Sequence, residues 1–150
     1  MSVHIRWIIS RDRSEVLAIE RQSFGPEAWG QGELVDFLKQ RHCIGMVAER
    51  GEKVVGFMIY ELHKSKLVLT RFAVAKEYRR QGVGTLMITK LVDKLAPDRR
   101  KRIVVEVPDT NLQAQLFFAH RGFRAVRVVG DCYRMEYRLR KEEECRNMSG

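Results

Sequence analysis

The 150-residue sequence lacks several features that would place it in a specialised class of protein. No segment approaches the ~20 consecutive apolar residues of a membrane-spanning helix, and residues 1–6 lack the charged start and apolar core of a signal peptide. Three cysteines are an odd number without metal-ligand spacing, so neither a disulfide framework nor a metal site is expected. Cysteines of this kind favour a reducing compartment. These absences predict a cytoplasmic protein that has no membrane partner.

The composition that remains is that of an ordinary globular domain, with 45% hydrophobic and 31% charged residues. A chain of this length can bury roughly two thirds of its unfolded surface, and no internal repeat or linker divides it. We therefore expect a single domain over residues 1–139, followed by a charged tail, residues 140–150, that we expect to be disordered. The net charge of +9 favours anionic ligands or a nucleic-acid-rich neighbourhood.

Apolar periodicity predicts seven strands and four helices. Their order, β-α-α-β-β-β-α-β-α-β-β, is that of a mixed α/β (α+β) layer structure rather than a parallel, doubly wound sheet. The strands are expected over residues 3–9, 44–49, 54–62, 67–74, 103–107, 123–129 and 132–139, and the helices over residues 14–24, around residues 34–38, and over residues 86–95 and 111–120.

Residues 79–85, with the sequence Arg-Arg-Gln-Gly-Val-Gly-Thr, join a predicted strand to a predicted helix. Gly82 and Gly84 have no Cβ, so the backbone can approach an anion closely and adopt positive φ. The N-terminus of the following helix attracts a phosphate group, and Arg79 and Arg80 add positive charge. An ordinary turn with two glycines is the alternative, but the flanking elements and the arginines favour a phosphate site.

Missing motifs narrow the kind of phosphate site. A P-loop requires G-x-x-x-x-G-K-[ST], and no lysine follows either glycine. The dinucleotide fingerprint requires a third glycine three residues after Gly84, where the sequence has Met87. The spacing that remains is R-x-x-G-x-G.

This spacing resembles the acyl-coenzyme A loop of the GNAT acetyltransferases, and the resemblance covers about residues 3–139. The sequence looks most like the RimI-type branch, bacterial enzymes that acetylate the N-terminal alanine of a ribosomal protein. The matching segments are residues 19–24 with Trp29, residues 72–80, and Glu106 followed by Asn111 and residues 116–123. The resemblance implies the GNAT fold, in which the central sheet splays apart at the acyl-CoA site.

The resemblance also implies a role for each matching residue, with acetyl-CoA as donor and a protein or peptide N-terminus as partner. Strand backbone groups hold the pantetheine, the loop N–H groups take the pyrophosphate, and Asn111 bonds the coenzyme arm. Glu106 matches the proposed general base. The residues assigned to the coenzyme are Phe72, Ala73, Val74, Arg79, Arg80, Gln81, Gly82, Val83, Gly84, Thr85, Asn111 and Phe118, and those assigned to the acceptor are Phe24, Trp29 and Tyr133.

A protonated amine cannot attack a thioester, so a base such as a carboxylate is needed to take the proton of the amine. An N-terminal amine has a pKa near 8 and is roughly one tenth neutral at pH 7, whereas a lysine with a pKa of about 10.4 is neutral in about one part in 2,500. One carboxylate could meet the smaller demand, directly or through water. The alternative for Glu106 is an acid that faces solvent or pairs with an arginine.

Two positions depart from the family pattern. The tyrosine that serves the family as general acid lies twelve residues after the glutamate, and that position is Phe118. Three alternatives follow: water protonates the leaving thiolate, Tyr133 or Tyr137 replaces the missing acid, or the enzyme is weak or inactive. The turn at residues 129–132 is also too short for the loop that covers the peptide in RimI-type chains, which leaves the acceptor side more open.

Several functions therefore remain open beside the leading one, N-terminal acetylation. The open hairpin favours a small amine or an internal lysine as acceptor, and Phe118 favours a weakly active or non-catalytic acyl-CoA-binding module. The basic residues 99–102 are a solvated connection, a contact for the coenzyme's adenosine phosphate, or a contact for ribosomal RNA. No aromatic residues are interleaved with them, so nucleic-acid binding has only charge in its favour.

Overall fold

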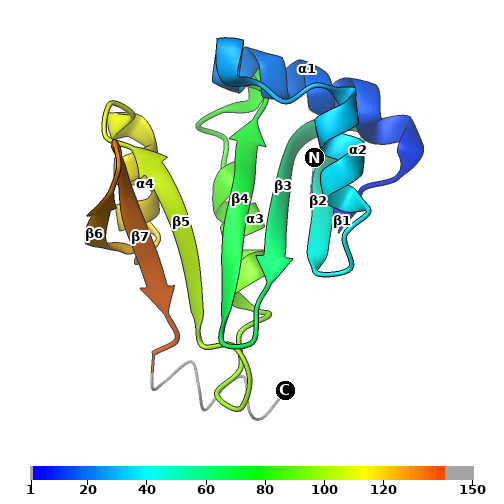
Figure 1. The fold of residues 1–150 in the computed structure, drawn as a ribbon. Helices are drawn as coiled ribbons and strands as arrows, with labels where there is room; N and C mark the ends of the chain where they lie inside the picture. Colours follow the sequence, from blue (N-terminus) through cyan, green and yellow to red (C-terminus); the bar gives the residue numbers. More distant parts are fainter. Residues whose placement is uncertain (1, 141–150) are drawn as a thin grey trace. The chain divides into compact units, whose positions relative to one another are not determined.

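A computed structural model describes residues 2–140, which form a mixed α/β fold with the predicted order of helices and strands (Figure 1). Three short 3-10 turns accompany them. The elements are β1 (Val3–Trp7), α1 (Arg13–Phe24), α2 (Gln31–Leu38), β2 (Cys43–Arg50), β3 (Lys53–Leu62), β4 (Lys66–Val74), α3 (Val83–Val92), β5 (Arg102–Pro108), α4 (Leu112–His120), β6 (Arg124–Val129) and β7 (Cys132–Arg138). Apart from Arg140, the predicted charged tail lies outside the described residues.

The helix boundaries differ from the predicted ones by one to three residues, and two of the differences bear on the site. Helix α3 begins at Val83 rather than Leu86, so Gly84 and Thr85 lie in its first turn. Helix α4 begins at Leu112, because Asn111 is its N-cap and its side-chain oxygen accepts a hydrogen bond from the N–H of Ala114 at 3.1 Å. An asparagine in this position satisfies an N–H group that the helix itself leaves unpaired.

The seven strands are hydrogen bonded in the order β1-β2-β3-β4-β5-β7-β6. The pairs β1–β2, β2–β3, β5–β7 and β6–β7 are antiparallel, and β4–β5 is parallel. The parallel ladder runs from the pair Lys66 and Arg102 to the pair Leu69 and Val105. Strand β4 continues beyond this ladder to Val74, where the residues that resemble the pantetheine-binding strand lie.

The described chain divides into two compact units, which we treat one at a time: residues 2–61 with 71–87, and residues 62–70 with 88–140. In the first unit, α1 and α2 pack their apolar sides on the sheet. Gly56 is required by close packing, because a Cβ there would lie 3.1 Å from both the carbonyl oxygen of Ala73 and the sulfur of Met87. One hydrophobic cluster of this unit's core consists of Val16, Leu17, Ile19, Leu34, Val47, Val54, Phe57, Ile59, Ala73 and Ala75.

In the second unit a chain of aromatic rings forms part of the core. The ring centroid of Phe118 lies 5.3 Å from that of Phe117 and 5.1 Å from that of Phe123. The centroids of Phe123 and Tyr137 are 5.7 Å apart. Phe118 and Tyr137 are each 4% exposed. Gly122 has φ +94°, and a Cβ there would lie 3.2 Å from the ring of Tyr137. The turn from α4 into β6 therefore depends on glycine for both conformation and space.

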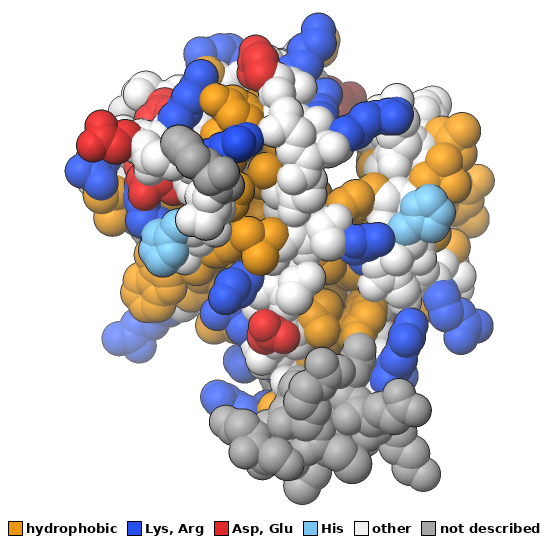
Figure 2. Space-filling model, turned by 180° about the vertical axis from the view of Figure 1, so that it is seen from behind, with side chains coloured by type: hydrophobic (Ala, Val, Ile, Leu, Met, Phe, Trp, Pro, Cys, Tyr) orange, Lys and Arg blue, Asp and Glu red, His pale blue; other side chains and the backbone are white. Residues whose placement is uncertain are grey.

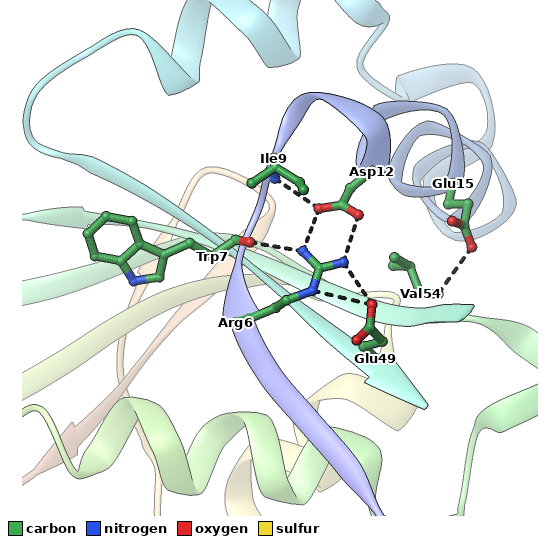
Figure 3. Close-up of polar contacts among 7 residues, drawn as sticks. All are labelled: Arg6, Trp7, Ile9, Asp12, Glu15, Glu49 and Val54. Atoms are coloured by element: carbon green, nitrogen blue, oxygen red, sulfur yellow. Dashed lines mark hydrogen bonds and ion pairs between the residues drawn. The ribbon is translucent and has the colours of Figure 1, made fainter. Parts of the chain in front are cut away.

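A buried ion-pair network joins β1, β2 and the start of α1 in the first unit (Figure 3). Both terminal nitrogens of Arg6 donate to the carboxylate of Asp12, at 2.8 and 2.9 Å, and Nη2 also donates to Glu49 at 2.9 Å. Asp12, 2% exposed, accepts a further bond from the N–H of Ile9 at 2.8 Å. The hydrogen bonds from Arg6 hold the pKa of Asp12 below its usual value. Each carboxylate oxygen of Asp12 thus has a donor, which is what a buried charge requires.

The Asp12→Asn variant is expected to lose about 2–3 kcal/mol in the free energy of unfolding, because it breaks a largely buried pair. The folded pKa of Asp12 lies below its unfolded value of about 3.9. The stabilisation is therefore complete above that pH and is lost as the pH falls through the folded pKa. Urea unfolding at pH 7 and pH 3 measures both effects. The exposed Asp98→Asn variant is the control, and an equal stability loss at both pH values for Asp12→Asn would contradict the assignment.

Candidate functional site

The predicted phosphate loop lies in the first unit, between β4 and α3. The carbonyl of Gly82 accepts the N–H of Leu86 at 3.0 Å, so Gly82 is the residue from which α3 begins. The first N–H groups of any helix have no partner within that helix. The sequence around Gly82 therefore presents the start of a helix, as the resemblance requires of a pyrophosphate site.

Two residues of this loop have left-handed backbone conformations, Arg80 with φ +62° and Gly82 with φ +85°. Of the two glycines that allow positive φ, Gly82 adopts it and Gly84 does not, because Gly84 lies in the first helical turn. Arg80 takes the second left-handed position, although a side chain there costs about 1–2 kcal/mol. Left-handed residues of this kind occur in loops whose successive N–H groups bind anions, and strained residues gather at functional sites. Binding of an anion by this loop stays a prediction.

The side chains around the loop hold its backbone in place. Arg79 donates from Nε to the carbonyl of Val74 at 2.9 Å and from Nη2 to the hydroxyl of Ser23 at 3.2 Å. Gln81 donates to the carbonyl of Glu77 and accepts from Arg50, both at 3.0 Å. Arg79 and Gln81 thus position the loop, and Arg79, Arg80 and Gln81 are all exposed.

The end of β4 leads directly into this loop. Ala73 is buried, and the N–H of Ala75 donates to the carbonyl of Val55 at 2.8 Å. Phe72 and Val74 are half-buried. The pantetheine role of residues 72–74 remains a prediction, and the structure places these residues on the strand that ends at the loop.

The predicted acceptor residues Phe24 and Trp29 also lie in the first unit, where they enclose a cation. The guanidinium of Arg71 lies 4.5 Å from the ring centroid of Phe24 and 4.4 Å from that of Trp29. Such contacts are attractive because the face of an aromatic ring is electronegative. Trp29 also contacts Phe37, with ring centroids 5.0 Å apart.

Glu20 anchors the same group from α1. Its Oε2 accepts the N–H of Trp29 at 2.8 Å and lies 3.4 Å from Nε of Arg71. Glu20 is 2% exposed, and this burial raises its pKa. Neither Glu20 nor Arg71 was predicted from the sequence as a site residue. The signals were present: an acid on the apolar side of a helix that also carries Val16 and Ile19, and an arginine inside an otherwise apolar strand.

Glu106 lies in the second unit, on β5, directly opposite Arg134 of β7. Its Oε2 is 3.6 Å from Nη2 of Arg134, and its side chain is 42% exposed. The pairing with an arginine that the sequence left open is therefore present. A solvent-exposed pair of this kind contributes little to stability. Because the side chain of Glu106 is exposed, a ligand or water can reach its carboxylate.

The remaining predicted residues of the second unit differ in exposure. Tyr133 is half-buried on β7, opposite Val107, and Asn111 is exposed at the start of α4. Phe118 and Tyr137 lie in the aromatic core. Among the two tyrosines considered as replacement acids, Tyr133 is therefore the more accessible one.

The basic residues 99–102 are partly committed to structural contacts. Arg100 donates to the carbonyl of His63 at 2.5 Å, and Arg102 pairs with Glu136 at 3.3 Å. Figure 2 shows Lys and Arg side chains scattered over the face that it presents rather than gathered in one patch. Arg100 and Arg102 therefore have contacts within the protein, and the three roles considered for the cluster stay predictions.

Several other classes of site find no support in the described part of the chain. Residues 2–140 contain no cluster of three or more His, Cys, Asp or Glu that could hold a metal ion, and none of their helices could cross a membrane. Cys43 is buried, and burial raises the pKa of its thiol. A thiol in such surroundings is a poor nucleophile.

The predicted site residues form two groups, one in each unit.

Comparison with known proteins gives these groups a context. The model of the Acetyltransferase (GNAT) family matches residues 10–123. Among curated proteins, N-alpha-acetyltransferase 30 of Xenopus laevis is 26% identical over an alignment of 121 residues that covers 77% of this chain. The chain spans 40% of the length of that relative.

Solved structures show the same fold at low sequence identity. The ribosomal-protein-S18-alanine N-acetyltransferase from Escherichia coli has a TM-score of 0.79 and 19% identity, covering 92% of this chain and 94% of its own. The paia N-acetyltransferase from Thermoplasma acidophilum, in complex with coenzyme A, has a TM-score of 0.71 and 16% identity, covering 93% and 100%. With the family model matching over residues 10–123, the chain belongs to the GNAT family of acetyltransferases.

Proposed function

We propose that the protein transfers the acetyl group of acetyl-CoA to the N-terminal α-amine of a protein or peptide. The observation that carries the coenzyme part is the loop in which Arg80 and Gly82 are both left-handed and α3 begins at Val83. The names of the curated relative and of the Escherichia coli structure support the acceptor. A ribosomal protein in the cytoplasm is the acceptor that the RimI-type resemblance suggests, and the free thiols of Cys43 and Cys132 agree with that compartment.

The proposed chemistry makes a modest demand on the protein's own groups. The amine must lose a proton before its nitrogen attacks the thioester carbon, and Glu106 takes that proton directly or through water. An N-terminal amine requires only about 1.4 kcal/mol for this step at pH 7, against about 4.6 kcal/mol for a lysine. An exposed carboxylate such as Glu106 suits the first of these acceptors better than the second.

The departing thiolate makes a similarly modest demand. A thiol pKa near 8.5 makes the thiolate a tolerable leaving group without a positioned acid. Phe118 has no proton to give and lies in the core, so water or Tyr133 supplies the proton in this proposal.

Two other functions keep a specific observation in their favour. Only Gly130 and Asp131 separate β6 from β7, and so short a turn favours an open site for a small amine or a lysine side chain. The burial of Phe118 favours an acyl-CoA-binding module with little or no activity. Both alternatives are outcomes of the following experiment.

CoA release is measured with peptides that have free alanine, serine or methionine N-termini, an N-acetylated lysine peptide, and a polyamine. We expect turnover on the free N-termini and a reduction of about 10²–10⁴-fold in kcat for Glu106→Gln, the usual effect of losing a general base. The exposed Glu52→Gln variant controls for charge. Turnover on lysine or polyamine alone would favour the small-amine alternative, and coenzyme binding without turnover on any acceptor would sink the enzymatic proposal.

The Phe118→Tyr variant tests where the leaving-group proton comes from. If Tyr133 or water already supplies it, kcat stays within about threefold, because a redundant acid adds little. A hydroxyl placed among Phe117 and Phe123 is also expected to cost about 1–3 kcal/mol of stability. Denaturant unfolding beside the kinetic assay separates the two effects, and a rise of tenfold or more in kcat would show that the native enzyme lacks an effective acid.

The coenzyme loop is tested by Gly82→Ala with Gly130→Ala as its matched control. Both glycines have positive φ, and a Cβ on either meets no atom within 4 Å. Both variants should therefore lose about 1–2 kcal/mol of stability through the backbone alone. Only Gly82→Ala is expected to weaken acetyl-CoA binding, by about tenfold or more, as measured by calorimetry. Equal affinities in the two variants would remove the loop from the coenzyme site.

A further inference from the structure

Arg71 stands out because it is a cation inside the apolar strand β4. Its guanidinium lies between Phe24 and Trp29, at 4.5 and 4.4 Å from their ring centroids, and its side chain is 20% exposed. A guanidinium stacked on aromatic faces is fixed in orientation while its edge keeps its hydrogen-bond donors. The residue thus presents a positioned positive charge beside the two proposed acceptor residues.

The contacts of Arg71 leave part of its donor capacity unused. Its Nε is buried without a hydrogen-bond partner, and Nη2 makes only a long bond of 3.4 Å to the carbonyl of Glu27. The carboxylate of Glu20 lies 3.4 Å from Nε, on one side of the group. This geometry is not the bidentate pair in which an arginine spends two parallel donors on one carboxylate. Arg6, by contrast, makes that bidentate pair with Asp12 in the same unit.

The partner, Glu20, is also incompletely paired. Its Oε2 accepts the N–H of Trp29, but its Oε1 is buried without a hydrogen-bond partner. Two buried polar atoms in one group without partners are costly, and such exceptions call for an explanation. A buried ion pair is weak evidence for stability, since well-packed apolar side chains often do as well. The group therefore fits a role in recognition better than a role in stability.

Charges of both signs lie near Arg71. Arg79, whose Nη2 donates to the hydroxyl of Ser23, is a second cation in the same unit. Glu27 contributes only its backbone carbonyl to Arg71. Glu20, the acid that pairs with Arg71 among the described residues, is buried, and Glu33 is near enough to help raise its pKa. The charge that a ligand can reach at this group is therefore the partly exposed guanidinium of Arg71, 20% exposed, rather than the buried carboxylate.

We infer that Arg71 is a specificity-determining residue that binds a carboxylate of the acceptor, so that peptides with Asp or Glu next to the N-terminal residue are preferred. This inference rests on the proposed function, because Phe24 and Trp29 are acceptor residues only under that proposal. Glu20 acts through Arg71 as a positioning residue, because its carboxylate lies beside Nε of Arg71 and accepts the backbone N–H of Trp29. A basic residue at the same place in the peptide is disfavoured by repulsion.

The test compares three peptides that differ only in their second residue, Asp, Asn or Lys. For the wild-type protein we expect kcat/KM to be about tenfold higher for Asp than for Asn, the worth of one charge-assisted hydrogen bond, and lower still for Lys. The difference should lie in KM rather than in kcat, because the carboxylate binds the ground state and the transition state equally.

The variants separate recognition from folding. Arg71→Gln should bring the Asp-to-Asn ratio to about one, and Arg71→Lys, which keeps the charge but loses the planar stack, should retain a part of it. Since Arg71→Gln leaves Glu20 unpaired, the double variant Glu20→Gln/Arg71→Gln repeats the measurement without a buried lone charge. The exposed Lys39→Gln variant controls for net charge and should keep the wild-type ratio.

The outcomes distinguish this inference from the function on which it rests. Two results overturn the inference and leave N-terminal acetylation standing. One is turnover of all three peptides by the wild-type protein with an Asp-to-Asn ratio near one. The other is a tenfold Asp-to-Asn ratio that survives in Arg71→Gln and in the double variant. Absence of turnover on every free N-terminus overturns both. A ratio that falls to about one in Arg71→Gln and in the double variant, but not in Lys39→Gln, supports the inference.

Discussion

The burial of two carboxylates is the constraint on which the first unit depends. Asp12 and Glu20 are each 2% exposed and each lies beside an arginine. A buried charge is expensive unless hydrogen bonds replace the water that it loses. Asp12 has such replacement in full, and its network ties β1, β2 and the start of α1 together. Glu20, two turns further along α1, has it only in part.

The two acids therefore titrate in opposite directions. The hydrogen bonds from Arg6 lower the pKa of Asp12, whereas burial raises the pKa of Glu20. Ionised Asp12 stabilises the folded state at neutral pH, and the stabilisation is lost as the pH falls. For Glu20 the folded state favours the proton, so its contribution is greatest at low pH and is lost as the pH rises through its folded pKa. The stabilising acid, Asp12, precedes α1 as its N-cap, and the costly acid, Glu20, lies within the helix beside the proposed acceptor residues.

Local signals in the sequence predicted most of the fold. Apolar periodicity located the strands and helices, and the loop was recognised from its glycines and its flanking elements. The boundary of α3 was wrong because helix starts depend on which carbonyl accepts the first bond, and Gly82 rather than Thr85 provides it. The left-handed residue at position 80 was also missed, since an arginine gives no local sign of a conformation that glycine adopts easily.

The candidate site was less predictable because its contacts join distant parts of the chain. Arg71 meets Glu20 across 51 positions of the sequence; Glu20 lies in the matching segment 19–24, but nothing in that segment pointed to its pairing with Arg71. Phe118 could be identified as a departure from the pattern, but only packing against Phe117 and Phe123 shows that it is a core residue. Motifs report residues that bind a shared coenzyme, whereas the partners that distinguish one acceptor from another are set by tertiary contacts.

The protein has Phe118 where the family pattern has a tyrosine as general acid, and the pKa values of the reacting groups reduce the need for that acid. If the acceptor is an N-terminal amine and the leaving group a thiolate, both proton transfers are close to balanced near neutral pH, because their pKa values lie within about 1–2 units of it. A positioned acid then contributes less than it would for a more basic leaving group. Binding and orientation of the amine become the larger part of the protein's task. Phe118 in place of the acid is therefore compatible with catalysis. The residues that would bind and orient the acceptor are the pair Glu20 and Arg71 and the rings of Phe24 and Trp29.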